Sequence, residues 1–158
     1  MSMRIGFGYD VHAFTPNRPL VLGGIPIPFD YGLSGHSDAD TVIHAIVDAL
    51  LGATALGDIG THFPSHDLRW KDQPSTLFLD YTYDLLCQHN YTIGNIDATI
   101  VAECPKLAPY IQEMRSHLAE HLHLEIEQVN VKATTTDGLG FAGRREGLGC
   151  YAVALITR

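Results

Sequence analysis

The sequence is poor in basic residues, and this scarcity limits the kind of partner that it can bind. Ten lysines and arginines stand against 18 aspartates and glutamates, which gives a formal net charge of -8 over 158 residues. A surface that binds a nucleic-acid backbone needs a basic face, so the composition argues against nucleic acid as a partner. An anionic small molecule would have to be held locally, by metal ions, helix N-termini and a few placed cations.

Cysteines and long apolar runs are scarce as well. Cys87, Cys104 and Cys150 are an odd number and form no C-x-x-C pair, which argues against a disulfide framework or a zinc knuckle. We expect three buried thiols in a reducing compartment, the cytoplasm. The N-terminus has no apolar signal region, and His44 and Asp48 interrupt the most hydrophobic stretch, so we expect neither an export signal nor a membrane span.

The residues that are present fit one folded domain over residues 1–158. Hydrophobic residues make up 46% of the chain, and a domain of this length buries roughly two thirds of its unfolded surface. Short strand-like runs alternate with amphipathic segments, which predicts a two-layer α+β fold: a mixed four-stranded sheet with helices packed on one face. The predicted strands are 4–12, 91–103, 129–136 and 149–157, with an edge hairpin at 19–29, and the predicted helices are 41–56, 75–90 and 110–122.

Polar residues stand at the predicted helix starts. Ser37, Asp38 and Asp40 are candidate caps of the first helix, and Ser75 is the candidate cap of the second. The loop at 57–74 is too long for a simple connector, which is typical of functional or mobile loops. The apolar face predicted for the second helix contains Leu77, Tyr81 and Leu85.

One strand and one helix together carry a candidate metal site. Asp10 and His12 alternate along the first strand, so both side chains project from one face, roughly 6.5 to 7 Å apart. The first helix places Asp40, His44 and Asp48 at successive i, i+4 positions. His44 would complete a set of two histidines and one carboxylate, the ligand count of a catalytic zinc with an open fourth position.

Each of these residues also has a structural interpretation. The Asp-x-His pair can be two polar groups on a solvated face, and His44 can be a satisfied core histidine. Asp48 either accepts a hydrogen bond from His44 and fixes its tautomer or faces solvent. His36 and Ser37 precede the helix, where its N-terminus favours phosphate oxygens, but ordinary capping would explain the same positions.

Four segments carry a resemblance to a known family. Residues 8–14, 35–60, 104–111 and 130–147 are similar, in order and over nearly the whole chain, to the 2-C-methyl-D-erythritol 2,4-cyclodiphosphate synthase family. The resemblance implies a homotrimer of small α/β subunits with active sites between neighbours. It also implies a reaction of the non-mevalonate isoprenoid pathway, in which 4-diphosphocytidyl-2-C-methyl-D-erythritol 2-phosphate is cyclised and CMP is released.

The resemblance also implies a role for individual residues. A second divalent ion, Mg²⁺ or Mn²⁺, would be held by Asp137; the family usually has Glu-Lys where this chain has Asp137 and Gly138. The implied catalytic residues are His36, Thr135 and Asp137. Zinc would be bound by Asp10, His12 and His44; the methylerythritol and phosphate part by His36, Ser37, Asp58 and Gly60; and the cytidine diphosphate part by Ala102, Pro105, Lys106, Leu107, Ala108, Ala133, Thr134 and Thr135 of the adjacent subunit.

The same resemblance implies a cavity on the trimer axis that can take an isoprenoid diphosphate. Phe141, Arg144 and Glu146 match the family positions that line it, although Arg144 and Glu146 can equally pair across subunits and hold the trimer. Two other functions remain as alternatives. One is a zinc phosphoesterase in which His36 or His66 assists a metal-activated water. The other is a trimeric module that binds metal or nucleotide without turnover.

Overall fold

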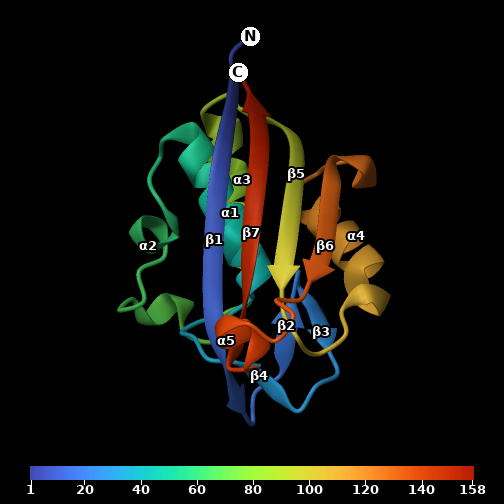
Figure 1. Ribbon diagram of the computed structural model, residues 1–158. Coiled ribbons are helices and arrows are strands. Elements are labelled where there is room, and N and C mark those ends of the chain that lie inside the picture. The colour runs from blue at the N-terminus through green and yellow to red at the C-terminus, as the bar shows by residue number, and fades with distance from the viewer.

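A computed structural model describes residues 1–158, and its centre is a mixed five-stranded sheet (Figure 1). The strand order is β4-β1-β7-β5-β6, with β5 and β6 parallel and the other neighbours antiparallel. The mixed α+β fold is confirmed, but the predicted count of four strands is wrong. The strands of this sheet are β1 (Met3–Pro16), β4 (Tyr31–Leu33), β5 (Thr92–Val101), β6 (Val129–Thr134) and β7 (Gly147–Thr157).

The fifth strand is β4, which lies between the predicted hairpin and the first predicted helix, where no strand is predicted. It pairs only with the last residues of β1, where Phe14 faces Leu33 and Pro16 faces Tyr31. The hairpin predicted at 19–29 is present as β2 (Leu20–Leu22) and β3 (Ile25–Ile27), but it forms a separate two-stranded sheet and does not join the edge of the main one.

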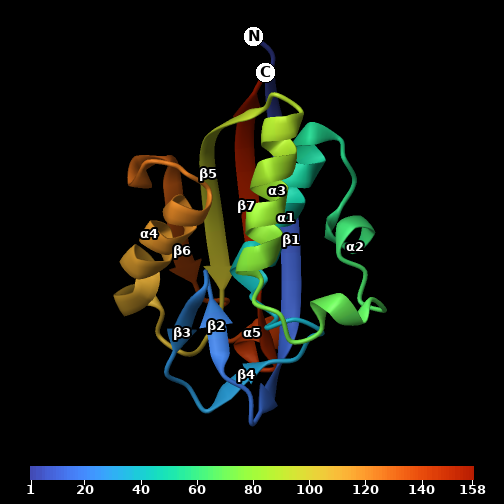
Figure 2. The same cartoon turned by 180° about the vertical axis from the view of Figure 1, so that it is seen from behind.

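The long helices cover one face of the sheet, as predicted (Figure 2). Helix α1 lies between the sheet and α3, and nearly all its residues are buried, which explains why most of them are apolar. Helix α4 packs against β6. The helices are α1 (Thr41–Thr54), α2 (Ile59–His62), α3 (Thr76–Gln88), α4 (Ile111–His121) and α5 (Gly140–Gly143), with single 3-10 turns at Leu68–Trp70, Ala108–Tyr110 and Ile126–Gln128.

Two glycines of β1 let α1 approach the sheet closely. A β-carbon at Gly6 would lie 1.8 Å from the carbonyl oxygen of Ala49, and one at Gly8 would lie 2.0 Å from that of Ala45. Both contacts are with backbone, which cannot move aside as a side chain can. The backbones of β1 and α1 therefore touch where other strand and helix pairs are separated by side chains.

The opposite face of the sheet is open and apolar. The odd-numbered residues of β1 point away from the helices, and Ile5 and Phe7 are 72% and 61% exposed. Tyr9 stacks on Tyr151 of β7 with ring centroids 4.8 Å apart. A contiguous apolar surface of this kind marks a site of association. Its members are Met3, Ile5, Phe7, Tyr9, Val11, Tyr151 and Val153, and we call it the open face.

Two expectations about side-chain burial are wrong, one for the cysteines and one for α3. Cys87 is exposed and Cys104 is half-buried, so only Cys150 is the buried thiol expected of all three. In α3, Leu77 and Tyr81 are exposed, because the helix turns the adjacent row that contains Phe78 and Thr82 toward α1. The buried hydroxyl of Thr82 donates a hydrogen bond to the carbonyl of Phe78 at 2.7 Å. The buried residues of α3 are Phe78, Leu79, Thr82 and Leu86.

No helix of the structure combines the length and the apolar character needed to cross a membrane.

Candidate metal centre and active site

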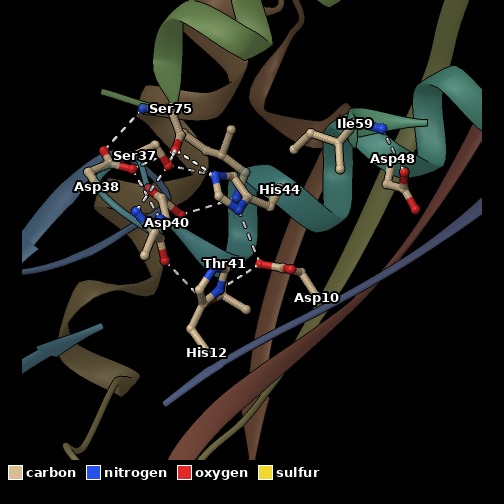
Figure 3. A network of polar contacts seen from close by, with 12 residues as sticks. Asp10, His12, Ser37, Asp38, Asp40, Thr41, His44, Asp48, Ile59 and Ser75 are labelled. Atoms are coloured by element: carbon tan, nitrogen blue, oxygen red, sulfur yellow. Dashed lines mark hydrogen bonds and ion pairs between the residues drawn. The ribbon is translucent and has the colours of Figure 1, made fainter. Parts of the chain in front are cut away.

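Asp10, His12 and His44 meet between β1 and α1 (Figure 3). The alternation of the strand turns Asp10 and His12, two and four residues beyond Gly8, toward the helix. Helix α1 presents His44 to them. Oδ2 of Asp10 lies 2.9 Å from Nδ1 of His12 and 3.2 Å from Nδ1 of His44. The structure thus brings together the three residues selected from spacing.

The shared carboxylate oxygen has the character of a metal ligand. Oδ2 of Asp10 is inaccessible to solvent, and although both imidazoles are near, neither makes a hydrogen bond of good geometry to it. Burial raises the pKa of the Asp10 carboxyl, but the two imidazoles outweigh burial and the pKa is lowered overall. An ionised, unsatisfied oxygen facing two imidazole nitrogens is a donor set that fits a divalent cation.

Helix α1 is capped by Asp40, as predicted. Its Oδ1 accepts hydrogen bonds from the backbone N–H groups of Ile43 and Gly23 at 3.1 and 2.9 Å, and its Oδ2 accepts one from Gly24 at 2.6 Å. Complete burial, with a contribution from the charge of Asp38, raises the pKa of Asp40 to about 6. Asp40 therefore joins the β2–β3 hairpin to the start of α1, one turn before His44.

The partner of the His44 imidazole differs from the one considered in the sequence. Asp48 does not contact the ring; its Oδ1 accepts from the backbone N–H of Ile59 at 3.1 Å and holds the start of α2, away from the cluster (Figure 3). The Nε2 atom of His44 lies instead 2.8 Å from the hydroxyl of Ser75. Ser75 is not a side-chain cap of α3, because its hydroxyl is turned into this site.

A cavity of about 480 Å³ opens beside the three clustered residues. Gly60 lines it together with His36 and Ser37, whereas Asp58 does not; the Asp58 carboxylate accepts from the N–H and hydroxyl of Thr61 and caps α2. These contacts lower the pKa of Asp58. The other lining residues come mainly from the long loop and α3: His12, His44, Ile59, Phe63, Pro64, Ser65, His66, Trp70 and Phe78.

Aromatic side chains form the far wall of this cavity. Phe63 stacks on Phe78 with ring centroids 4.3 Å apart, and the Trp70 ring stands edge-on to both. His36, shortly before α1, contacts the long loop, because its Nε2 lies 3.2 Å from the carbonyl of Asp67. The residues of the long loop thus pack into one side of the site, and nothing in the sequence indicated the aromatic contacts that Phe63 and Trp70 make there.

A second cavity of about 250 Å³ lies at the ends of β5 and β6. Its lining contains all eight residues matched to the cytidine diphosphate pocket, from Ala102 to Thr135, and also Glu103. Sequence reasoning missed Glu103, whose carboxylate accepts from the N–H groups of Thr136 and Gly138 at 2.9 and 3.2 Å. These backbone hydrogen bonds lower the pKa of Glu103. Glu103 therefore fixes the loop that follows β6.

Asp137 lies on that loop and lines neither cavity. It has a left-handed backbone with φ of 53°, and its Oδ1 accepts from the hydroxyl of Thr135 at 3.3 Å. The first cavity takes His12 from β1, and the second lies at the ends of β5 and β6; strand β7 lies between β1 and β5 in the sheet. Within one chain the two groups of predicted residues therefore stay apart.

The residues matched to an axial cavity do not all line the same hollow in one chain. Phe141 lines a small hollow of about 150 Å³ under the open face, beside Tyr9 and Tyr151. Arg144 does not line it; the Nε atom of Arg144 donates to Glu146 of the same chain at 2.9 Å.

Comparison with known proteins identifies relatives along the whole chain. The YgbB family matches residues 3–157. A 2-C-methyl-D-erythritol 2,4-cyclodiphosphate synthase of Geobacter metallireducens is 58% identical over 156 residues, which cover 99% of each chain. Among solved structures, the bifunctional IspDF of Campylobacter jejuni shares 41% identity with a TM-score of 0.95 over 98% of this chain, which spans 42% of that protein. The IspF of Plasmodium falciparum, solved as a CDP complex, shares 34% identity with a TM-score of 0.87, over 98% of this chain and 96% of that one.

Proposed function

Because the chain belongs to the YgbB family, whose curated relatives bear the name 2-C-methyl-D-erythritol 2,4-cyclodiphosphate synthase, we propose that it catalyses the reaction of that name. The substrate is 4-diphosphocytidyl-2-C-methyl-D-erythritol 2-phosphate, and the products are the cyclic diphosphate and CMP. The observation that carries the proposal for this chain is the convergence of Asp10, His12 and His44 on one point beside a cavity. The reaction belongs to the non-mevalonate pathway and takes place in the cytoplasm; three free cysteines support a reducing compartment.

Asp10, His12 and His44 would hold a zinc ion. Their fit rests on the unsatisfied Oδ2 of Asp10 and on two imidazole nitrogens within 3.2 Å of it. When bound, such an ion supplies polarisation of a phosphate oxygen and offsets its charge. We assign a second divalent ion, Mg²⁺ or Mn²⁺, to Asp137. Its exposed carboxylate and the neighbouring Thr135 offer the oxygen ligands that these ions prefer.

The side chains of the protein then have to hold the flexible substrate in a reactive conformation. The 2-phosphate of the substrate attacks its β-phosphate, the bond to the α-phosphate breaks, and CMP leaves. A phosphate is already ionised near neutral pH, so no side chain has to act as a general base. His36 and Ser37, on the rim of the first cavity, would hold the methylerythritol end with Gly60 and Asp58. Positioning both ends in this way is worth up to roughly 7–11 kcal/mol.

The second cavity would hold the cytidine diphosphate end. Backbone groups from Pro105 to Ala108 and the side chains of Thr134 and Thr135 line it, and Lys106 adds a single cation. Two of the similar structures are described as CDP-bound, which supports a cytidine nucleotide as the ligand class. Because the two cavities lie on different strands of one chain, a substrate that spans both is better served by two neighbouring subunits.

A homotrimer would bring the two cavities together. The open face of β1 and β7 supports this assembly, since it exposes seven large apolar side chains on one side of the sheet. The hollow lined by Phe141 would then lie on or near the axis and accept an isoprenoid diphosphate. The engagement of Arg144 by Glu146 favours a structural role for that pair over the binding of a diphosphate.

Turnover of the authentic substrate tests the proposal. The protein, loaded with zinc and Mg²⁺, is incubated with 4-diphosphocytidyl-2-C-methyl-D-erythritol 2-phosphate, and the products are separated by chromatography. We expect equal amounts of CMP and the cyclic diphosphate. Inorganic phosphate and hydrolysis products alone would favour a zinc phosphoesterase, and CDP binding without turnover would favour a binding module.

A further inference from the structure

Behind His44, on the side away from Asp10, lies a buried chain of polar groups (Figure 3). Ser75 is fully buried at the start of α3, and its hydroxyl lies 2.8 Å from Nε2 of His44. The same hydroxyl lies 2.5 Å from Oδ1 of Asp38. Ser75, which is more than 30 residues away in the sequence, thus joins Asp38 to the imidazole of His44 in a continuous line.

The direction of the hydrogen bonds along this line follows from proton counting. A carboxylate only accepts, so the single proton of the Ser75 hydroxyl is donated to Asp38. The Ser75 oxygen therefore acts as the acceptor toward His44, and the proton between them belongs to Nε2 of the imidazole. In the neutral ring, Nδ1 is then unprotonated, and Nδ1 is the atom that lies 3.2 Å from Oδ2 of Asp10.

The backbone of Ser75 supports this direction. Its N–H donates to Oδ2 of Asp38 at 3.1 Å, which holds Ser75 beside that carboxylate. Ser37, whose hydroxyl is 3.2 Å from Nε2, offers a second, longer acceptor for the same proton.

We propose that Asp38 and Ser75 are positioning residues that fix His44 in the tautomer with a free Nδ1 lone pair directed at the metal position. The inference rests on the metal role proposed above for His44. Neither residue touches the substrate's reacting atoms; both act through the imidazole. Partners of this kind hold a ligand ring in place, and their loss typically costs roughly 10–100-fold in metal affinity.

Nitrogen NMR of the metal-free protein tests the tautomer without using activity. Samples labelled at histidine nitrogens are recorded at alkaline pH, and His44 is assigned by comparison with the His44→Ala spectrum. We expect a protonated Nε2 and an unprotonated Nδ1 in the unaltered protein. Ser75→Ala should give a mixture of tautomers, whereas Ser116→Ala, a matched change at an exposed serine of α4, should leave the spectrum unchanged.

The Asp38→Asn variant tests the order of the line. Its amide can present N–H groups to Ser75, which turns the Ser75 hydroxyl to donate to Nε2 and moves the ring proton to Nδ1. Zinc affinity, measured by competition with a coloured chelator, should fall roughly 10–100-fold in Ser75→Ala and further in Asp38→Asn. In the Ser75→Ala background, Asp38→Asn should have no additional effect, because the intermediate link is already missing.

Independent, additive losses from the two changes would overturn the proposal, as would a Ser75→Ala protein with the normal tautomer and normal zinc affinity. A general loss of stability would not mimic the expected result, since it would not change which nitrogen carries the proton. If the unaltered protein bound no zinc, the metal role itself would fall, and the nitrogen spectra would still decide whether Asp38 and Ser75 fix the tautomer.

Discussion

The carboxylate of Asp10 and the imidazole of His44 face each other across the contact between β1 and α1, with Oδ2 and Nδ1 3.2 Å apart. One residue is on a strand and the other on a helix, so their meeting depends on how closely the two elements pack. That closeness is provided by Gly6 and Gly8, which lack the side chains that would hold α1 away. The candidate metal centre is therefore a product of backbone packing as much as of ligand chemistry.

The first prediction concerns His44 itself. His44→Ala should lose bound zinc and turnover together, with a fall in affinity larger than the roughly 10–100-fold expected for its positioning partners. The fold should persist, which far-UV circular dichroism can check while elemental analysis measures zinc. His89→Ala removes an exposed histidine and should keep both zinc and turnover. An active, metal-free His44→Ala protein would contradict the ligand assignment.

The second prediction concerns the contact between β1 and α1. Gly8→Ala places a methyl group against the Ala45 carbonyl and should destabilise the protein by about 1–3 kcal/mol or more, with weaker zinc binding. Gly52→Ala is the matched control, because this exposed helical glycine has no atom within 4 Å of an added β-carbon. It should stabilise the protein by about 0.5–1 kcal/mol. Urea unfolding of both variants measures these changes, and equal effects would refute the close-packing argument.

The third prediction is a pH dependence from Asp40. Its pKa is raised to about 6, above the ordinary value of 3.8, so the folded state keeps a proton that the unfolded state has released. The contribution of Asp40 to stability is therefore full below pH of about 4 and is lost as the pH rises to about 6, with a total loss of about 3 kcal/mol.

Asp40→Asn provides the comparison for this pH dependence. The variant loses hydrogen bonds at every pH, but the difference in unfolding free energy between it and the unaltered protein should follow the titration of Asp40. Carbon NMR of the labelled carboxyl should show a midpoint near pH 6. A midpoint near the ordinary value, with a flat stability difference, would be inconsistent with the expected effect of burial.

The fourth prediction concerns the second divalent ion. Asp137→Ala should keep zinc affinity unchanged, since Asp137 is not among the three residues that converge on the zinc position, and should weaken the dependence of turnover on Mg²⁺. A Mg²⁺ titration of the initial rate in the zinc-loaded enzyme measures this change. Asp84→Ala, at an exposed position of α3, controls for loss of a negative charge. An unaltered Mg²⁺ titration for Asp137→Ala would move the second-ion role elsewhere.

Local patterns in the sequence account for much of the candidate site. Strand alternation placed Asp10 and His12 on one face, and helical periodicity placed His44 on a buried helix. The link between them is a tertiary contact, which neither pattern contains; only the family resemblance supplied it. The pocket at β5 and β6 was predicted by the same route, apart from Glu103, whose role depends on a loop that folds back on it.

The features that the sequence did not predict depend on a very short element or on contacts that a local pattern does not contain. Strand β4 has three residues and one partner, too few for alternation to be visible. Ser75 was predicted to cap its own helix because that is the usual local use of serine, yet the distant Asp38 captures its hydroxyl. Asp48 has helical spacing from His44, but the free N–H at the start of α2 provides a closer partner.

The alternation of β1 has a consequence for how this chain can tolerate change. Its even positions carry the two metal-facing residues and the two close-packed glycines, while its odd positions carry the apolar open face. A single-residue insertion or deletion between Met3 and Asp10 would turn some of these residues to the wrong side. Substitutions can alter one face at a time, but changes in length cannot, so this strand should be nearly closed to insertions and deletions during evolution.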